Sequence, residues 1–267
     1  MKTILVLLDG LNYTTANRTL GHLKAMCKKG LGQSYIVRCE LPALSRPLYE
    51  CVLTGVTPVD SGIVNNRVTR LSNQQSIFHY ARAAGLTTAA AAYHWISELY
   101  NRTPFVAARD RHTDDEQLTI QHGHFYYVDH YPDSHLFVDG ESLRRRYNPD
   151  FLFIHSMNID DAGHRYGQNT SQYRDSARSV DSILSEYLAN WLQDGYQVII
   201  TADHGMDDDG NHCADTDEES LVPFFVFGDG FSLKEDVTIA QTEICGTVCQ
   251  LLNIPHDKPY CRDLLKE

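Results

Sequence analysis

Carboxylates and histidines recur in this chain directly after predicted strands. Six of them stand at such places or one short loop later: Asp9, Asp160, His164, Asp203, His204 and His212. Carboxylate oxygen and imidazole nitrogen together suit zinc, and also manganese or iron. Each fragment alone is weak, because an Asp-Gly after a strand is more often a turn. Taken together, the six residues predict a site for divalent metal ions.

A hydroxyl that could serve as a nucleophile, that of Ser45, precedes a predicted helix over 47–54. A serine at the start of a helix is most simply an N-cap. The same position offers free backbone N–H groups to a phosphate. A metal ion beside it could lower the pKa of the hydroxyl and make it a nucleophile. The residues alone leave the cap and the nucleophile open.

Such a site needs a frame that brings strand ends together. Apolar runs predict strands at 3–8, 34–39, 87–93, 150–157, 196–205 and 221–228, and helical patterns cover 16–29, 47–54, 73–84, 170–193 and 239–252. This alternation predicts an α/β fold with a central, mainly parallel sheet and helices on both faces. Ligands of such sheets bind beyond the carboxyl ends of the strands, where the six residues fall.

The segment 94–148 differs from the rest, because it is rich in histidine and aromatic residues and has weak periodicity. We expect a single catalytic domain over 1–267, with 94–148 as a small cap or lid over the site. Aromatic rings there could stack on a base or another flat leaving group.

Composition restricts the partners and the compartment. The formal charge of the 267 residues is −12, which disfavours a nucleic-acid polymer and leaves a small phosphate-containing substrate. Seven cysteines without a CxxC pair fit a reducing compartment. No run of about 18 apolar residues predicts a membrane span, and the short apolar N-terminus lacks a cleavage site. We therefore expect a cytoplasmic protein without a membrane partner; its oligomeric state is not predicted.

The order of the motifs resembles the alkaline phosphatase superfamily, and most closely its nucleotide pyrophosphatase/phosphodiesterase branch. The resemblance covers residues 4 to about 228, leaves 94–148 unmatched, and rests on these features: Asp9, Ser45-Arg46-Pro47, Thr54-Gly55, Gly62-Ile63-Val64-Asn65-Asn66, Asp160 with Gly163-His164, Asp203-His204-Gly205-Met206, and His212.

This resemblance implies an alkaline-phosphatase-like fold with two divalent ions, zinc first and manganese second. One ion would be held by Asp9, Ser45, Asp203 and His204, and the other by Asp160, His164 and His212. Ser45 would attack phosphorus and form a phosphoserine, with a metal at each side of the displacement. Asn66 and a backbone N–H near Arg46 would bind a non-bridging oxygen.

Some positions depart from the branch or stay open. The branch usually has threonine as its nucleophile, the histidine common before Gly-Ile is Ser61, and Cys213 replaces a glycine. Asp161 is an alternative to Asp160 as a ligand. Arg46 either contacts a phosphate oxygen or faces solvent.

The resulting expectation is a metal-dependent phosphodiesterase or nucleotide pyrophosphatase. Phosphomonoester or phosphonate hydrolysis is the second choice, and a non-catalytic metal-binding protein on the same fold is the rival from another class. A sulfatase is less favoured, since Tyr49 stands where an arginine is expected. A dinucleotide-binding Rossmann domain lacks its GxGxxG after the first strand.

Overall fold

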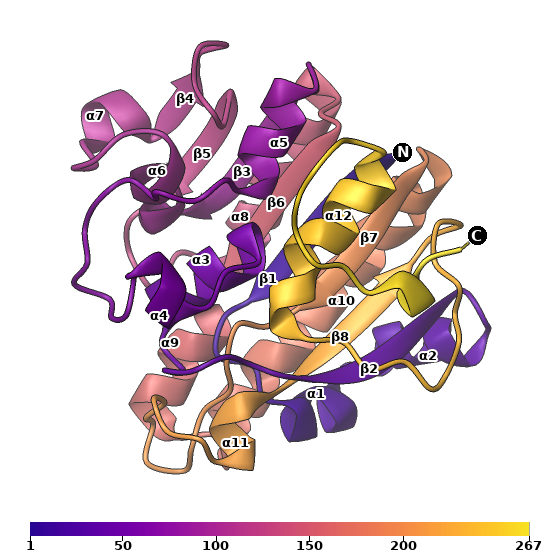
Figure 1. Cartoon of the computed structure of the whole chain (residues 1–267). Coiled ribbons are helices and arrows are strands. Elements are labelled where there is room, and N and C mark those ends of the chain that lie inside the picture. Colours follow the sequence, from indigo (N-terminus) through magenta and orange to yellow (C-terminus); the bar gives the residue numbers. More distant parts are fainter. Residues whose placement is uncertain (267) are drawn as a thin grey trace.

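The computed structural model describes residues 1–266, which build one eight-stranded sheet covered by helices (Figure 1). The strands lie in the order β2-β8-β7-β1-β6-β3-β5-β4. Their bounds are β1 Lys2–Leu8, β2 Gly32–Arg38, β3 Thr88–Tyr93, β4 His112–Asp114, β5 His122–Tyr126, β6 Phe151–Ser156, β7 Tyr196–Thr201 and β8 Leu221–Phe227.

The centre of the sheet is parallel. Strands β7, β1, β6, β3 and β5 pair in parallel, as expected for apolar runs that are covered on both faces. Residues 4–8 of β1 are fully buried, and so are the four alanines at 89–92 of β3. The helix that carries Gly140 approaches the sheet closely, because a Cβ on Gly140 would lie 2.8 Å from Ile154 of β6 and 3.8 Å from Ala91 of β3.

Three pairings are antiparallel: β4 with β5, β8 with β7, and β2 with β8. Since β8 reverses the direction of β7, and β2 reverses that of β8, β2 again points the same way as the central strands. The carboxyl end of β2 therefore meets the same edge of the sheet as those of β1, β6 and β7. The mainly parallel α/β fold is confirmed.

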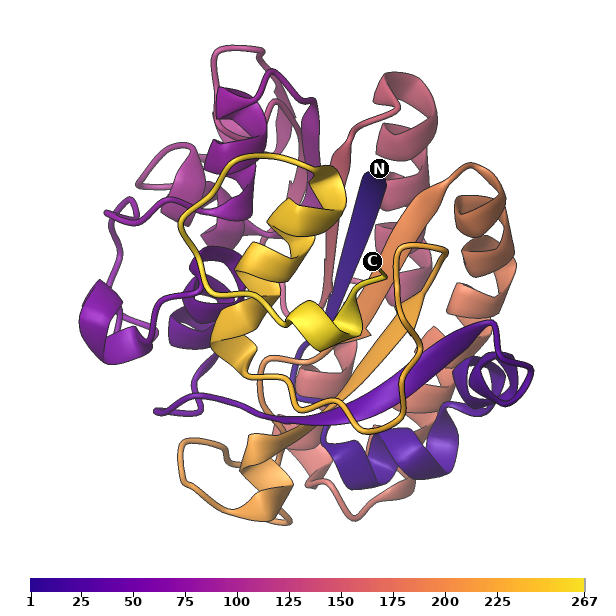
Figure 2. The ribbon, with the colours of Figure 1, turned by 45° about the vertical axis from the view of Figure 1, so that its right-hand side comes forward.

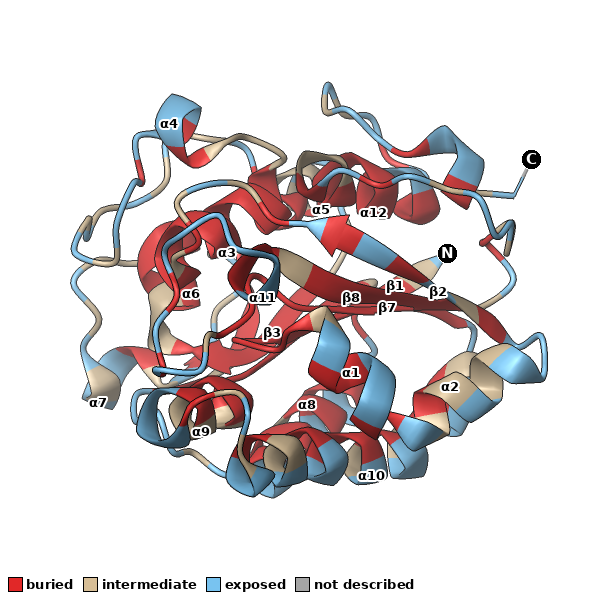
Figure 3. Ribbon diagram, turned by 90° about the horizontal axis from the view of Figure 1, so that it is seen from below, coloured by how far each residue is buried: buried red, intermediate tan, exposed pale blue. Residues whose placement is uncertain are grey.

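Helices cover both faces of the sheet, as expected (Figure 3). One face carries α3 (Ser45–Thr54), α5 (Ile77–Ala83) and α12 (Ile244–Leu252), with α12 lying over β1 (Figure 2). The other carries α1 (Tyr13–Thr19), α2 (Gly21–Lys28), α8 (Asp133–Tyr147), α9 (Asn158–Tyr166) and α10 (Ser171–Gln193). Shorter helices are α4 (Pro58–Ser61), α6 (His94–Tyr100), α7 (Ala107–Asp110), α11 (Asp217–Ser220), η1 (Gln241–Glu243) and η2 (Arg262–Leu264). In the described chain, no helix has the length and apolar character that crossing a bilayer requires.

The helix expected over 16–29 is two helices, because the backbone leaves the helical region at Leu20 (ψ 69°). The N-terminus of the second helix, α2, is capped by a side chain from α10. The Asp181 carboxylate on α10 accepts the N–H groups of His22 at 2.7 Å and Leu23 at 3.1 Å. A carboxylate at that end satisfies free donors and suits the helix dipole.

The expectation that 94–148 as a whole is a lid is wrong. Strands β4 and β5 extend the sheet beyond β3, and α8 packs against β3 and β6. Strands β4 and β5 give only a weak periodic pattern in the sequence, because they are short and lie at the edge of the sheet. Two parts of this segment do reach the carboxyl edge of the sheet: α6, which follows β3 directly, and residues 127–133, which follow β5 and bond to the end of β6 through Asp133 and Ser156.

Candidate metal centre

The six predicted ligands meet at the carboxyl edge of the sheet. Asp9 follows β1, Asp160 and His164 lie on α9 after β6, Asp203 and His204 follow β7, and His212 lies in the loop that leads to α11 (Figure 1). Parallel central strands place these chain-distant residues side by side.

A first group consists of Asp9, Asp203 and His204, all fully buried, with one ligand atom of each within 4.8 Å of the others. His204 Nε2 lies 3.4 Å from Asp9 Oδ1 and 3.3 Å from Asp203 Oδ2. Ser45 Oγ lies 3.1 Å from the same nitrogen. These four residues are the ones that the resemblance assigns to one ion.

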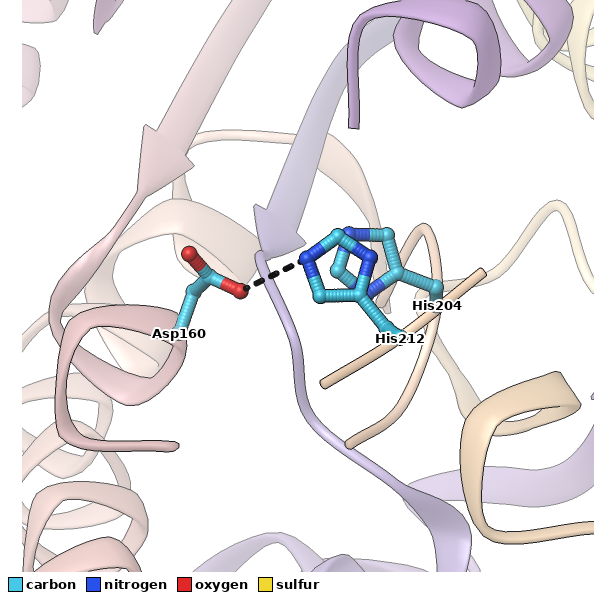
Figure 4. Close-up of side chains that lie close together, drawn as sticks. All are labelled: Asp160, His204 and His212. Carbon is cyan, nitrogen blue, oxygen red and sulfur yellow. Dashed lines mark ion pairs between the residues drawn. The ribbon is translucent and has the colours of Figure 1, made fainter. Parts of the chain in front are cut away.

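A second group consists of Asp160, His204 and His212, whose side chains converge from three different segments (Figure 4). His212 Nε2 lies 3.8 Å from Asp160 Oδ1. The predicted third member, His164, is also close: its Nε2 lies 3.4 Å from Asp160 Oδ2 and 3.2 Å from His212 Nε2. His204 therefore stands between the two groups, with its ring stacked on His212 at 3.7 Å.

The three histidines are all oriented in the same way. Nδ1 of His204 contacts the carbonyl of Gly205 at 2.9 Å, Nδ1 of His164 that of Gly210 at 2.8 Å, and Nδ1 of His212 that of Ala43 at 2.7 Å. A carbonyl only accepts, so each Nδ1 carries a proton, and in the neutral form of each ring the Nε2 lone pair points into the site. Metal-binding histidines are held in this way. Two such lone pairs at 3.2 Å, as in neutral His164 and His212, repel unless a metal ion or a proton lies between them.

The three carboxylates are each held by one oxygen and free at the other. Asp9 Oδ1, Asp160 Oδ1 and Asp203 Oδ2 are buried and have no hydrogen-bond partner. Asp9 Oδ2 contacts Tyr49 and His155, and Asp203 Oδ1 accepts the Gly10 N–H. Asp160 Oδ2 faces His164 Nε2 at 3.4 Å, an ion pair when His164 is protonated. A buried, unpaired carboxylate oxygen is costly, and coordination to a cation removes that cost. The donor set thus fits divalent ions, with a composition that suits zinc or manganese.

The electrostatics of this donor cluster favour bound protons. Burial and the charge of Asp160 raise the pKa of Asp9 to about 7. Burial and both neighbouring carboxylates raise the pKa of Asp203 well above its usual range. The hydrogen bond with Asp160 raises the pKa of His164 to about 9, whereas burial lowers that of His212 to about 3. Neighbouring carboxylates disfavour one another's ionised forms, and a bound divalent cation would offset that repulsion.

Ser45 is not a helix cap. Leu44 holds the cap position of α3, and Ser45 is the first helical residue, with its hydroxyl against His204. Asn66 lies beside it, where its Oδ1 accepts the backbone N–H of Arg46 at 3.0 Å.

Arg46 does not face solvent, so that alternative is wrong. Its side chain is 2% exposed, bonds Glu98 Oε2 at 2.8 Å and lies 4.4 Å from the centre of the Trp95 ring. Its Nε and Nη1 have no partner. Glu98 and Trp95 lie on α6, so the start of the segment 94–148 packs against the helix that carries Ser45.

Other members of the predicted set lie away from the ligands. Asp161 pairs with Arg165 at 2.9 Å, whereas its neighbour Asp160 faces the histidines. Within 94–148, His122 stacks on Tyr147 and His124 faces Asp139 at 3.4 Å.

The sequence reasoning missed Tyr49 and His155, both of which contact Asp9. His155 lies in the apolar strand β6 and is fully buried. A histidine within such a run was the signal, because a buried imidazole needs a polar partner.

The chain is similar to known proteins in sequence and in fold. The sequence model of the family "Type I phosphodiesterase / nucleotide pyrophosphatase" matches residues 3–218. The human GPI ethanolamine phosphate transferase 2 catalytic subunit is 22% identical over 99% of this chain and 27% of its own length. Mouse GPI ethanolamine phosphate transferase 1 is 32% identical over 39% of this chain and 12% of its own length. The chain thus spans about a quarter or less of these relatives.

Among solved structures, murine ectonucleotide pyrophosphatase/phosphodiesterase 5 superposes with a TM-score of 0.77 at 15% identity, covering 100% of both chains. The human counterpart gives the same TM-score, identity and coverage. At this identity, the similarity shows a shared fold.

Proposed function

Because the chain belongs to the type I phosphodiesterase/nucleotide pyrophosphatase family, we propose that it is a metal-dependent phosphodiesterase that acts through Ser45. One observation carries the proposal. Ser45 Oγ lies 3.1 Å from His204 Nε2, which itself contacts the unpaired oxygens of Asp9 and Asp203. A hydroxyl held against a cation-ready cluster is the arrangement that metal-assisted phosphoryl transfer needs.

The proposed ligand sets are Asp9, Ser45, Asp203 and His204 for one ion, and Asp160, His164 and His212 for the other. Two divalent ions, when bound, would lower the pKa of the Ser45 hydroxyl and offset negative charge on the phosphoryl oxygens. Zinc is our first choice and manganese our second, since both accept imidazole and carboxylate donors.

The chemistry proceeds in two displacements at phosphorus. Ser45 Oγ forms a bond to phosphorus while the bond to the leaving oxygen breaks, and the proton of the hydroxyl passes through solvent to that oxygen, which gives a phosphoserine ester and an alcohol. Water then attacks the phosphoserine, the monoester leaves, and Ser45 regains its proton. We propose that the Asn66 side-chain amide binds a non-bridging oxygen beside Ser45. Its Oδ1 already accepts the Arg46 backbone N–H at 3.0 Å, so that N–H can bind the oxygen as well only when this bond is shared or opens.

A second candidate is favoured by one finding. The similarity to a GPI ethanolamine phosphate transferase extends over 99% of this chain. A transferase shares the first displacement, and an alcohol then replaces water in the second. A phosphomonoesterase uses the same steps on a dianionic ester, and Arg46 would there bind the additional charge.

We also propose that residues 1–267 form one catalytic domain, that its substrate is a small phosphate-containing molecule, and that it acts in the cytoplasm without a membrane or nucleic-acid partner. The location is supported by seven free cysteines. Fractionation of cells that express the tagged chain tests it.

The function is tested with bis-p-nitrophenyl phosphate beside p-nitrophenyl phosphate, each with Zn²⁺ or Mn²⁺. The wild type should cleave the diester faster, and Ser45→Ala should lose at least about a thousandfold in kcat. Ser72→Ala is the matched control, since its hydroxyl bonds Glu50 outside the site. Faster monoester cleavage would favour the phosphomonoesterase. An active Ser45→Ala enzyme, or a wild type that binds metal and transforms neither ester, would overturn the proposal. The p-nitrophenyl ester of ethanolamine phosphate as donor, with a sugar alcohol as acceptor, then tests the transferase.

A further inference from the structure

The carboxylate of Asp9 is held from behind by two buried donors. The Tyr49 hydroxyl on α3 donates to Asp9 Oδ2, and His155 Nε2 on β6 lies 3.1 Å from the same oxygen. All three side chains are fully buried. Because both donors converge on Oδ2, the other oxygen, Oδ1, is left without a partner and faces His204.

The tautomer of His155 is fixed by its other nitrogen. The backbone N–H of Tyr93 points at His155 Nδ1 at 3.4 Å, and since an N–H only donates, Nδ1 accepts. The proton of the neutral ring is therefore on Nε2, where it donates to Asp9. The Tyr49 ring packs edge-on against His155 with centroids 4.5 Å apart, which holds both donors in one arrangement.

The two donors come from different layers of the fold. His155 is on the strand next to β1, in register with Leu7, and Tyr49 is one helical turn after Ser45 on α3. The Tyr49 hydroxyl thus links α3, the helix that carries Ser45, to the Asp9 carboxylate. No other described carboxylate of the site has two side-chain donors on one oxygen.

We propose that Tyr49 and His155 are positioning residues that turn Asp9 so that Oδ1 alone is offered to a metal ion. The inference rests on the proposed metal dependence of this site, and nothing in the family match assigns a role to either residue. Outer partners of metal ligands restrict ligand rotation, and removing one typically weakens binding about 10- to 100-fold.

The test measures metal binding directly. Zn²⁺ titration calorimetry and the visible spectrum of bound Co²⁺ are recorded for the wild type, Tyr49→Phe, His155→Leu and His155→Gln. The Gln side chain can place an N–H near the position of Nε2, whereas Leu cannot. The matched control is Tyr100→Phe, which removes a buried hydroxyl that donates to Glu50 Oε2 at 2.7 Å, outside the site.

We expect Tyr49→Phe and His155→Leu to raise the Kd of one ion at least about tenfold, with an altered Co²⁺ spectrum, and to leave the other ion within threefold. His155→Gln should recover most of the loss, and Tyr100→Phe should bind as the wild type. Equal Kd values in Tyr49→Phe and Tyr100→Phe would overturn the inference, as would equal weakening of both ions. A wild type that binds no metal would instead refute the proposed function, so the two failures are distinguishable.

Discussion

The buried pair between Arg46 and Glu98 gives the sharpest prediction for stability. Arg46 is next to Ser45, and the two side chains of the pair are 2% and 8% exposed. Replacing Glu98 by Gln leaves the guanidinium charged and buried without its counter-charge. Since Nε and Nη1 already lack partners, no other acceptor is at hand to replace the carboxylate.

The expected magnitude follows from these contacts. Breaking one side of a buried ion pair costs about 3–5 kcal/mol, while the Trp95 ring at 4.4 Å stabilises the cation by up to about 2 kcal/mol. The ring contact persists in the variant, so Glu98→Gln should lose about 3 kcal/mol of unfolding free energy. The double variant Arg46→Met with Glu98→Gln removes the stranded charge and should recover at least about 2 kcal/mol of that loss.

Urea unfolding of the wild type, both single variants and the double variant at pH 7.5 with a chelator measures the cycle. The chelator keeps metal binding from adding to stability. A Glu98→Gln protein within about 1 kcal/mol of the wild type, or a coupling energy near zero, would refute the reasoning that the charge is desolvated.

Three further predictions concern the site and its surroundings. Asp203→Ala should lose one of two bound ions and at least about a hundredfold in kcat, measured by metal analysis and diester turnover; full activity at normal metal load contradicts the ligand assignment. If the Arg46 guanidinium binds the extra charge of a monoester, Arg46→Met should lower kcat/KM for p-nitrophenyl phosphate more than for the bis-ester, and equal losses reject that role. Burial raises the pKa of Asp133 from 3.8 to about 7, so its folded state binds the proton more tightly than the unfolded chain. Its contribution to stability should therefore fall as the pH rises between these values, by at most about 4 kcal/mol at 1.36 kcal/mol per unit. Urea unfolding at pH 5 and pH 8 should show a smaller pH dependence in Asp133→Asn than in the wild type, which keeps the contribution of Asp133 beside those of Asp9 and Asp203.

The positions of the six candidate metal ligands could be predicted because the carboxyl ends of parallel strands meet at one edge of the sheet. Asp9, Asp160 and Asp203 each follow a buried apolar run, and such runs end at the same edge of the sheet. The hydrophobic pattern therefore predicted both the sheet and the place where these side chains meet.

Features that depend on contacts between distant segments could not be predicted. The start of α2 is capped by Asp181, which lies 159 positions after His22 in the chain. The burial of Arg46 depends on Trp95 and Glu98, and charged residues are assigned to the surface unless their partners are known. Short edge strands such as β4 carry too few residues for a periodic signal.

The direction of β2 within the sheet decides whether Ser45 reaches the ligands, and it depends on how many antiparallel pairings lie between β2 and β7. Ser45 follows β2, and β2 points toward the ligands since its antiparallel pairing with β8 and that of β8 with β7 cancel each other. If β2 paired antiparallel with β7 directly, the seven-residue strand would deliver Ser45 to the opposite edge, about 23 Å from Asp9 at 3.3 Å per residue. Strands can therefore be added or removed here without loss of the site in pairs, or singly where the new neighbours pair in parallel.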